Sequence, residues 1–322
     1  MRRAVIMGVG AALPERIVTN ADLEKTVDTS HDWIVSRTGI EQRHIAADGQ
    51  LTSDLAAQAG KQALANAGVS ADSIDMVILA TTTPDDTMPA TATKVQRMIG
   101  AVNAAAFDVN AACSGFVYAM TVANSLIVSG QAKRILLIGA ETYSRILDWN
   151  DRGTCILFGD GAAALVLEAQ EQKGSSDDRG VLYCGIRSDG QTELLGTSGG
   201  VSSTQKSGFL FMSGKEIYRN AVTRMPEAVV EGLKSINLPL ESIDWLVPHQ
   251  ANLRILAGVG QKLAVAPERV ISTVQKHANT SAASIPLALY QAAQDGRLQP
   301  GQLIACPALG AGLTWGCVIL RW

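Results

Sequence analysis

The sequence predicts an α/β protein built as a layered αβαβα sandwich of two similar halves. Short apolar runs typical of buried strands alternate with longer helical patterns along the whole chain, as expected for sheets flanked by helices. Several segments recur at a nearly constant separation, which indicates duplication. The composition, with 47% hydrophobic and 18% charged residues among 322, fits a globular chain with a large core.

The first half begins with a strand. The apolar run 4–10 follows Met1-Arg2-Arg3 and imitates a targeting signal, but its glycines and the Leu13-Pro14 that follows favour a buried strand and a turn. Helical patterns and strand-like runs then alternate. The helical patterns cover 55–67 and 116–128, the latter ended by Gly130, and the strand-like runs cover 73–79, 104–107, 135–138 and 162–167.

The second half repeats this order. Ser73-Ile74-Asp75 recurs as Ser242-Ile243-Asp244, and each copy separates a helical pattern from a strand-like run. Ser129-Gly130 has a counterpart in Asp295-Gly296 at almost the same separation along the chain, each ahead of another such run. Two copies of one β/α unit would give this near-constant offset. The most polar stretch, 171–180, is the expected boundary, with halves of residues 1–172 and 173–322.

Charge and cysteine usage exclude several classes of function. The net charge of −3 argues against general nucleic-acid binding. The five cysteines contain no Cys-x-x-Cys pair, which argues against a disulfide framework or a thiolate metal site and favours a reducing, cytoplasmic setting. Four of them, Cys155, Cys184, Cys306 and Cys317, lie in strand-like apolar runs and are expected in the core. No run approaches the roughly 20 apolar residues of a membrane span.

Cys113 is the first candidate for chemistry. It lies in Asp108-Val109-Asn110-Ala111-Ala112-Cys113-Ser114-Gly115, directly before the almost wholly apolar helical pattern 116–128, and therefore at the N-terminus of a buried helix. Unpaired N–H groups and the helix dipole at such a position lower the pKa of a thiol and favour the nucleophilic thiolate. The alternative is a buried, inert cysteine, and this segment alone does not exclude it.

Two further segments contain candidate catalytic residues that are expected to lie near Cys113. His277-Ala278-Asn279-Thr280-Ser281-Ala282 is the second-half counterpart of Asn110–Gly115 and again heads a helical pattern, 284–293. A pseudo-twofold axis would bring the two helix N-termini face to face. Pro248-His249-Gln250-Ala251-Asn252 follows a second-half strand, and ligands of α/β sheets bind beyond the carboxyl ends of strands. Cys113, His249 and Asn279 are therefore expected to converge.

Together these motifs resemble β-ketoacyl-acyl carrier protein synthase III, an initiating condensing enzyme with the thiolase fold. The resemblance spans essentially the whole chain, and the motifs are specific jointly although each alone is weak. In order, the matching segments are Asp32-Trp33-Ile34-Val35-Ser36-Arg37-Thr38-Gly39-Ile40, Ala112-Cys113-Ser114-Gly115, Pro248-His249-Gln250-Ala251-Asn252, His277-Ala278-Asn279-Thr280-Ser281-Ala282-Ala283-Ser284 and Gly310-Ala311-Gly312-Leu313-Thr314-Trp315-Gly316.

The resemblance implies a reaction and its catalytic residues. An acyl group passes from coenzyme A to Cys113, and decarboxylation of malonyl-acyl carrier protein then gives 3-oxoacyl-acyl carrier protein, which initiates type II fatty acid biosynthesis. By analogy, Cys113, His249 and Asn279 form the triad, and the backbone N–H groups of Cys113 and Ala311 form the oxyanion hole. His249 Nε2 and the Asn279 amide would donate to the enolate oxygen. Coenzyme A thioesters are substrates, and no metal or redox cofactor is needed.

Binding residues are also implied by the resemblance. Trp33 and Arg152 are expected to sandwich the adenine of coenzyme A, and the nucleotide and pantetheine path is expected to be lined by Thr29, Arg37, Gly214 and Asn252. Cations at the rim of a site steer acidic partners such as acyl carrier protein; the candidates are Lys215, Arg219, Arg254 and Lys262. Pro226 is expected to kink or break the helix 217–236 beside them.

The family is homodimeric, and a partner residue closes the acyl pocket. Met88 matches that residue, and both Met88 and Leu309 replace a phenylalanine common in relatives, so primers longer than acetyl are expected to enter. The leading interpretation is the initiating condensing enzyme, with no nucleic-acid or membrane partner. One alternative is a paralogous ketosynthase or acyltransferase of secondary metabolism that makes a polyketide or quinolone starter unit. Another is a non-catalytic binding protein for coenzyme A or acyl carrier protein, which the intact Cys-His-Asn set opposes.

Overall fold

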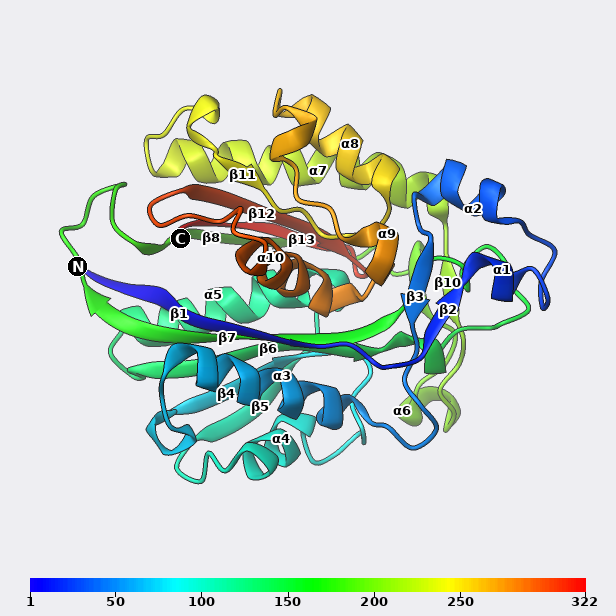
Figure 1. The fold of residues 1–322 in the computed structure, drawn as a ribbon, viewed down its shortest axis with the longest axis horizontal. Coiled ribbons are helices and arrows are strands. Elements are labelled where there is room, and N and C mark those ends of the chain that lie inside the picture. Colours follow the sequence, from blue (N-terminus) through cyan, green and yellow to red (C-terminus); the bar gives the residue numbers. More distant parts are fainter.

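The computed structural model describes residues 1–322 and arranges them in five layers (Figure 1). Two sheets enclose a central pair of helices, α5 (Gly115–Val128) and α10 (Ser284–Gln294), whose apolar side chains join the largest core cluster. In Figure 1, α3 (Thr52–Ala67) and α4 (Thr91–Ile99) cover one sheet from below, and α7 (Gly214–Ser235) and α8 (Leu253–Lys262) cover the other from above. This is the predicted αβαβα sandwich.

The first sheet has five strands in the order β1-β7-β6-β4-β5. β4 runs parallel to β5 and β6, whereas β7 runs antiparallel to β6 and β1. The inner strands β4 and β6 are nearly continuous apolar runs, because helices cover both faces of the sheet. The strands span Arg2–Ala12 (β1), Met76–Ala80 (β4), Ala105–Val109 (β5), Arg134–Thr142 (β6) and Asp160–Glu171 (β7).

The second sheet repeats this order as β8-β13-β12-β11, with an isolated bridge between Leu246 and Val270 in the place of the fifth strand. β11 (Trp245–Leu246) follows β4 along the chain by the same interval as β12 (Leu303–Gly310) follows β6. β13 (Thr314–Arg321) and β8 (Gly180–Ser188) complete the sheet. The predicted duplication is therefore confirmed, although β11 is shorter than the predicted strand.

The chain also repeats one sharp corner. The 3-10 turns η2 (Ala112–Ser114) and η6 (Ser281–Ala283) lead into α5 and α10, and both begin with a left-handed residue: φ is 47° at Ala112 and 49° at Ser281. Asn110 Oδ1 accepts from the Ala112 N–H at 3.4 Å, and Asn279 Oδ1 accepts from the Ser281 N–H at 2.8 Å. Asn110 thus corresponds to Asn279, two residues later than the sequence comparison placed its counterpart.

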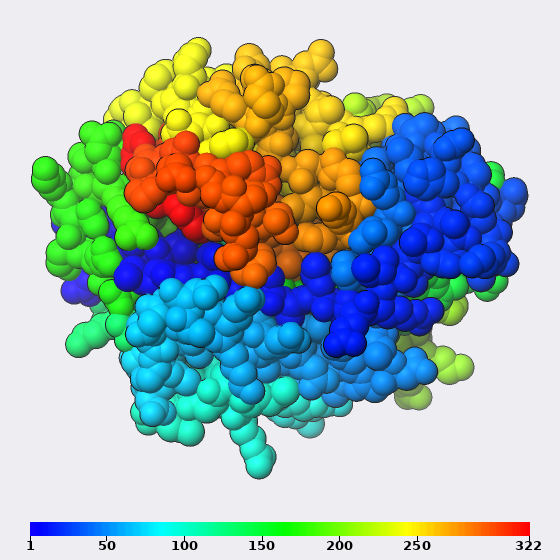
Figure 2. All heavy atoms as spheres, viewed as in Figure 1, coloured from blue at the N-terminus to red at the C-terminus, as the bar shows by residue number.

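Residues 17–44, between β1 and α3, form a cap beside the second half. In Figure 2 their blue atoms lie against orange atoms of the C-terminal half. Arg43 is fully buried beneath this cap, where its guanidinium donates to Val18 O, to Asn20 Oδ1 and to Ile156 O at 2.8–3.3 Å. The cap consists of β2 (Ile17–Thr19), α1 (Asn20–Leu23), α2 (His31–Thr38) and β3 (Gln42–His44).

Several shorter elements connect these layers. They are η1 (Ala71–Ser73), η3 (Tyr143–Arg145), β9 (Leu195–Thr197), α6 (Val201–Thr204), β10 (Leu210–Met212), η4 (Leu240–Ser242), η5 (Pro267–Arg269) and α9 (Val274–His277). No helix of the protein is both long enough and apolar enough to cross a membrane.

Two local predictions need correction. Pro226 does not break its helix, because α7 continues from Gly214 to Ser235 and its buried face, which includes Pro226, packs on β12 and β13. Cys155 is buried as expected but lies in a turn-rich segment between η3 and β7, not in a strand. The other three cysteines predicted in the core lie in β8, β12 and β13.

Candidate active site

Cys113 lies at the centre of η2, at the N-terminal end of α5 as predicted, and is almost fully buried. The first residue of β13 holds this corner in place: Thr314 Oγ1 donates to Ala111 O at 3.1 Å, and Ser114 Oγ donates to Thr314 O at 2.8 Å. Gly310 ends β12 so close to the corner that a Cβ there would lie 2.8 Å from the Cys113 nitrogen. Only glycine fits this approach.

One cavity of about 120 Å³ brings Cys113, His249 and Asn279 together from three distant stretches of the chain. Three other predicted site residues, Gly214, Asn252 and Leu309, also line it. The remaining lining is mostly apolar and comprises Leu157, Phe158, Leu195, Met212, Ile217, Ala221, Met225, Ala251 and Ile255. The expected convergence of the three side chains is therefore present in the fold.

His249 follows β11 on a rigid segment. Its N–H donates to Pro307 O at 2.9 Å. The neighbouring Gln250 side chain donates to Pro248 O and Ile271 O and accepts from the Thr273 N–H. Burial lowers the pKa of His249 to about 3, so the ring is neutral at pH 7. Its buried Nδ1 has no hydrogen-bond partner within the protein.

The orientation of the Asn279 amide is fixed by its neighbours. Its backbone pairs with the segment after η3, as Asn279 N donates to Leu157 O at 2.9 Å and Gly159 N donates to Asn279 O at 3.0 Å. Because Oδ1 accepts from the Ser281 N–H, the Nδ2 donor is left free for the cavity that Cys113 also lines. Asn279 is therefore held as a hydrogen-bond donor toward the sulfur and any ligand beside it.

Cys113 is a thiol in the free protein. Its pKa is raised to about 12, chiefly by burial and to a lesser extent by Glu141, against the opposing effect of hydrogen bonds from Ser281, the Cys113 backbone and Asn279. The lowered pKa expected at a helix N-terminus is not observed, because this helix begins inside the core and desolvation of the thiolate outweighs the dipole. The resting pair is a protonated Cys113 and a neutral His249.

Ala311 lies beside this cavity in the loop after β12. Its N–H makes no hydrogen bond within the protein, as an oxyanion donor requires. It lines a second pocket of about 550 Å³ together with Ala112, Thr82 and Tyr143. Leu195 lines both pockets, so they are neighbours.

The residues expected to bind the nucleotide meet on α2. The Arg37 Cζ lies 4.7 Å and the Arg152 Cζ 5.2 Å from the centre of the Trp33 ring. A base between Trp33 and Arg152 needs about 7 Å, two van der Waals contacts, so the expected sandwich is closed and Arg152 would have to move. Arg152 instead donates to Asp28 O and Oδ2. The buried Thr29 hydroxyl has no partner.

The remaining predicted residues lie away from the cavity. Met88 is 84% exposed and does not line it. Lys215 and Arg219 lie on α7, and Arg254 and Lys262 lie on the neighbouring α8. All four are exposed, and none forms an ion pair.

Sequence reasoning missed the polar groups behind Cys113. Glu141 in β6 is fully buried and accepts hydrogen bonds from Thr81, Thr82 and Thr83. Tyr143 is also buried, and its hydroxyl lies 3.3 Å from Ser281 Oγ. The sequence offered two signals for these groups: Glu141 ends one apolar run, and Thr81-Thr82-Thr83 ends another. Their pairing depends on strand order, which the sequence alone did not specify.

Comparison with known proteins agrees with this geometry. A family model described as 3-oxoacyl-[acyl-carrier-protein (ACP)] synthase III matches residues 107–190, and the model of its C-terminal part matches residues 233–322. The chain is 55% identical to beta-ketoacyl-[acyl-carrier-protein] synthase III of Rhizobium rhizogenes (strain K84) over 100% of both chains.

The chain is also similar to two solved structures. The 3-oxoacyl-(acyl carrier protein) synthase III of Pseudomonas aeruginosa PAO1 is 44% identical, with a TM-score of 0.93 over 99% of this chain and 98% of that chain. The priming beta-ketosynthase of the R1128 polyketide biosynthetic pathway is 31% identical, with a TM-score of 0.91 over 99% and 97%.

Proposed function

The chain belongs to the β-ketoacyl-[acyl-carrier-protein] synthase III family, and we propose that Cys113, His249 and Asn279 carry the two half-reactions of that family. The protein is an acyltransferase that condenses an acyl-CoA primer with malonyl-acyl carrier protein and so initiates fatty acid biosynthesis. The observation that supports the residue assignment is the single cavity in which the thiol, the imidazole and the amide meet.

In the first half-reaction the acyl group moves from coenzyme A to sulfur. Cys113 Sγ attacks the thioester carbonyl, and the proton of the thiol ends on the departing coenzyme A sulfur. Negative charge develops on the carbonyl oxygen, and the N–H groups of Cys113 and Ala311 are the proposed donors. The free N–H of Ala311 supports this role.

In the second half-reaction the malonyl thioester loses CO₂ and becomes an enolate. Its carbon attacks the acyl–Cys113 carbonyl, the C–S bond breaks, and the sulfur takes up a proton. His249 Nε2–H and Asn279 Nδ2–H are the proposed donors to the enolate oxygen. The neutral ring of His249 and the fixed Asn279 amide support this assignment, because both present a proton without a prior rearrangement.

Coenzyme A and acyl carrier protein are the substrates, and we assign their contacts to two groups of residues. The nucleotide and pantetheine would follow Thr29, Trp33, Arg37, Arg152, Gly214 and Asn252. The unpartnered hydroxyl of Thr29 and the stacked Trp33 support that path. Lys215, Arg219, Arg254 and Lys262 would receive the acidic carrier protein, since these exposed cations of α7 and α8 form no ion pair within the protein and Arg254 lies over the Tyr218 ring.

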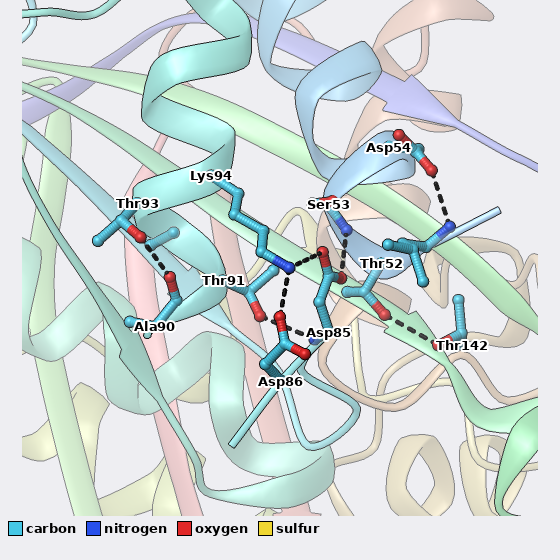
Figure 3. A network of polar contacts seen from close by, with 12 residues as sticks. Thr52, Ser53, Asp54, Asp85, Asp86, Ala90, Thr91, Thr93, Lys94 and Thr142 are labelled. Atoms are coloured by element: carbon cyan, nitrogen blue, oxygen red, sulfur yellow. Dashed lines mark hydrogen bonds and ion pairs between the residues drawn. The ribbon is translucent and has the colours of Figure 1, made fainter. Parts of the chain in front are cut away.

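We propose a homodimer in which Met88 enters the acyl pocket of the partner. Met88 is 84% exposed, and β5 is an edge strand whose outer edge is unpaired, with Val102 exposed beside it. Asp85 anchors the loop that carries Met88: it accepts from the Ser53 N–H at 3.0 Å and pairs with Lys94 (Figure 3). The unpaired sheet edge together with the exposed Met88 and Val102 supports burial of this surface by a partner.

The remaining assignments follow from this function. We propose that the enzyme works in the cytoplasm, where its five free cysteines stay reduced. We also propose that its halves are residues 1–172 and 173–322, because residues 172–179 connect β7 of the first sheet to β8 of the second sheet. A role in secondary metabolism is the second candidate; the 31% identity to a polyketide priming enzyme supports it less than 55% identity supports fatty acid synthesis.

One experiment tests the assignment directly. The protein is incubated with a panel of acyl-CoAs with and without malonyl-acyl carrier protein, and protein and products are analysed by mass. Wild type is expected to carry one acyl group on Cys113 and to release 3-oxoacyl-acyl carrier protein, and Cys113→Ala is expected to do neither. An adduct that survives in Cys113→Ala would disprove the nucleophile. Turnover only with an acceptor other than malonyl-acyl carrier protein would favour the second candidate.

A further inference from the structure

A three-residue turn carries the proposed oxyanion donor Ala311. Residues 311–313 connect β12 to β13, and none of their N–H groups donates a hydrogen bond within the protein. Gly312 follows Ala311 and has no side chain that could fix the backbone there. An oxyanion donor lowers the barrier only if it is held in place before the reaction. The turn must therefore be held by contacts from outside it.

Two carbonyl groups of the turn accept hydrogen bonds. The Thr314 hydroxyl donates to Ala311 O at 2.9 Å and also to Ala111 O at 3.1 Å. Asp189, directly after β8, donates its N–H to Leu313 O at 2.8 Å. The single hydroxyl proton of Thr314 is shared between two acceptors, whereas the Asp189 N–H makes one bond only. Asp189 is therefore the firmer of the two contacts that hold the turn.

Asp189 is itself held by Arg224 of α7, the helix that covers β8 and β13 (Figure 1). Arg224 Nη2 donates to Asp189 Oδ2 at 2.8 Å, and Gln191 Nε2 donates to the same oxygen at 2.7 Å. The Arg224 side chain is only 23% exposed. A charge-assisted hydrogen bond in such partly buried surroundings is strong and weakly screened. The pair therefore ties α7 to the residue that bonds the turn.

The same guanidinium also contacts the strand that leaves the turn. Arg224 Cζ lies 4.1 Å from the centre of the Trp315 ring, within the range of a cation–π contact, and Nε donates to Asn220 Oδ1 at 2.9 Å. Trp315 is the second residue of β13 and pairs with Leu309 of β12. Arg224 thus contacts both sides of the turn, β8 through Asp189 and β13 through Trp315.

Arginine is the side chain that can make these three contacts together. Its guanidinium is planar and carries donors along its edge. The face can therefore lie on an indole while the edge donates to a carboxylate and to an amide oxygen. With its face and two donors engaged, the Arg224 side chain has little freedom to move, and it is a rigid support for the residues beside the turn.

We propose that Arg224 is a positioning residue that fixes the Ala311 N–H for the oxyanion of the acyl-transfer step. This inference rests on the proposed role of Ala311 as an oxyanion donor. Arg224 does not line the cavity that holds Cys113. It acts through Asp189 and Trp315, which hold the turn from two sides.

The two half-reactions separate this role from simple stabilisation of the fold. Acylation of Cys113 needs the Ala311 N–H, because negative charge develops on the thioester oxygen. Decarboxylation of the malonyl thioester uses the other proposed donors, His249 and Asn279. Loss of Arg224 should therefore slow acylation and spare decarboxylation, whereas an ion pair that only stabilises the protein would affect both steps alike or neither.

The test measures acylation of Cys113 by intact mass over a range of acetyl-CoA concentrations. Arg224→Ala is expected to lower the maximal rate about five- to fiftyfold, a part of the roughly 10²–10³ that loss of the donor itself costs. The acetyl-CoA concentration at half-maximal rate should change by less than about twofold, since binding is not affected. Decarboxylation of malonyl-acyl carrier protein without primer should stay within about twofold of wild type.

Two further variants check the route from Arg224 to the turn. Asp189→Asn keeps the N–H that bonds Leu313 but loses the carboxylate, so it should slow acylation in the same way even if Arg224→Ala fails to fold. The double variant should be no slower than Arg224→Ala, because both changes break the same contact. Glu231→Gln is the matched control: Glu231 forms another ion pair between α7 and β8, with Arg187, and makes no hydrogen bond to the turn. It should acylate at the wild-type rate.

Two outcomes would overturn the inference: acylation at the wild-type rate in Arg224→Ala and Asp189→Asn, or equal losses in acylation and decarboxylation. Neither outcome touches the proposed function, which is tested by the acyl adduct on wild-type Cys113. If that adduct forms while both variants react like wild type, only the role of Arg224 is wrong. If wild type forms no adduct, the nucleophile assignment fails whatever the variants do.

Discussion

Asn279→Ala should separate the two half-reactions. The variant removes the Nδ2 donor to the enolate oxygen but leaves Cys113 and the N–H of Ala311 in place. Loss of one preorganised oxyanion donor costs about 10²–10³ in rate, or about 2.7–4 kcal/mol, so decarboxylation of malonyl-acyl carrier protein should fall by that factor. Acylation of Cys113 should fall by less than about tenfold, since Asn279 is the weakest of three hydrogen-bond partners that lower the pKa of the thiol.

The same substitution has a separate effect on stability. The Ser281 N–H that now donates to Asn279 Oδ1 at 2.8 Å would lose its acceptor in the core, which costs about 1–3 kcal/mol. Asn110→Ala is the matched control. Asn110 makes the equivalent turn contact in the other half, at 3.4 Å, but supplies no donor to the enolate. It should lose less stability and show no selective defect in decarboxylation.

Both half-reactions can be measured on one preparation. Acylation is followed by the mass of the protein after mixing with acetyl-CoA, and decarboxylation by the conversion of malonyl- to acetyl-acyl carrier protein in the absence of primer. Denaturant unfolding gives the free energy of unfolding of each variant. Equal losses in both half-reactions of Asn279→Ala would refute the assignment and would mean that Asn279 supports the cysteine or the fold.

Four further outcomes are expected. Gly310→Ala should prevent acylation and lower the free energy of unfolding by at least about 1–3 kcal/mol, because its Cβ would lie 2.8 Å from the Cys113 nitrogen; wild-type acylation would contradict the close approach. Arg254→Glu should reduce kcat/KM for malonyl-acyl carrier protein several-fold, less so at high salt, whereas Arg97→Glu on the distant α4 should not; equal effects would exclude α8 as the docking face. Met88→Phe with Leu309→Phe should restore discrimination against butyryl-CoA, worth about 1–3 kcal/mol per methylene; strong rejection of butyryl-CoA by wild type would show that other residues close the pocket. The buried His249, whose pKa falls from 6.5 to about 3, binds a proton more readily when unfolded, so stability should fall as the pH drops below 6.5, by about 2–3 kcal/mol at pH 4.5. His249→Asn should lose correspondingly less in acid, and an unchanged pH profile would mean that the ring is not desolvated.

The duplication and the catalytic constellation could be predicted because they depend on order along the chain. Apolar runs mark strands, repeated motifs mark the two halves, and a polar motif after each strand marks one edge of the sheets. This reasoning located Cys113, His249 and Asn279 without any coordinates. The glycine-rich segment that contains Gly310 came from the family resemblance, and the close approach of Gly310 to Cys113 was not predicted.

Protonation and side-chain pairing could not be predicted in the same way. The sequence places Cys113 at a helix N-terminus but does not say how deeply that terminus is buried, and burial reverses the direction of its pKa shift. Glu141 lies far along the chain from the threonines that bind it, so only the parallel pairing of β4 with β6 brings them together. Arg152 lies over the Trp33 ring and donates to Asp28, a side-chain arrangement that no pattern in the chain records.

The left-handed corner occurs in both halves. This repetition bears on whether backbone strain next to Cys113 contributes to catalysis. A non-glycine residue with φ near 50° is unfavourable by about 1–3 kcal/mol, and at Ala112 it is tempting to regard that cost as tension stored next to the sulfur. Ser281 has the same backbone angle at a corner whose next residue, Ala282, carries no reactive group. The conformation is therefore inherited from the repeated unit as a means of turning from strand to helix. With the same backbone turn, one copy carries the nucleophile Cys113 and the other carries the amide of Asn279.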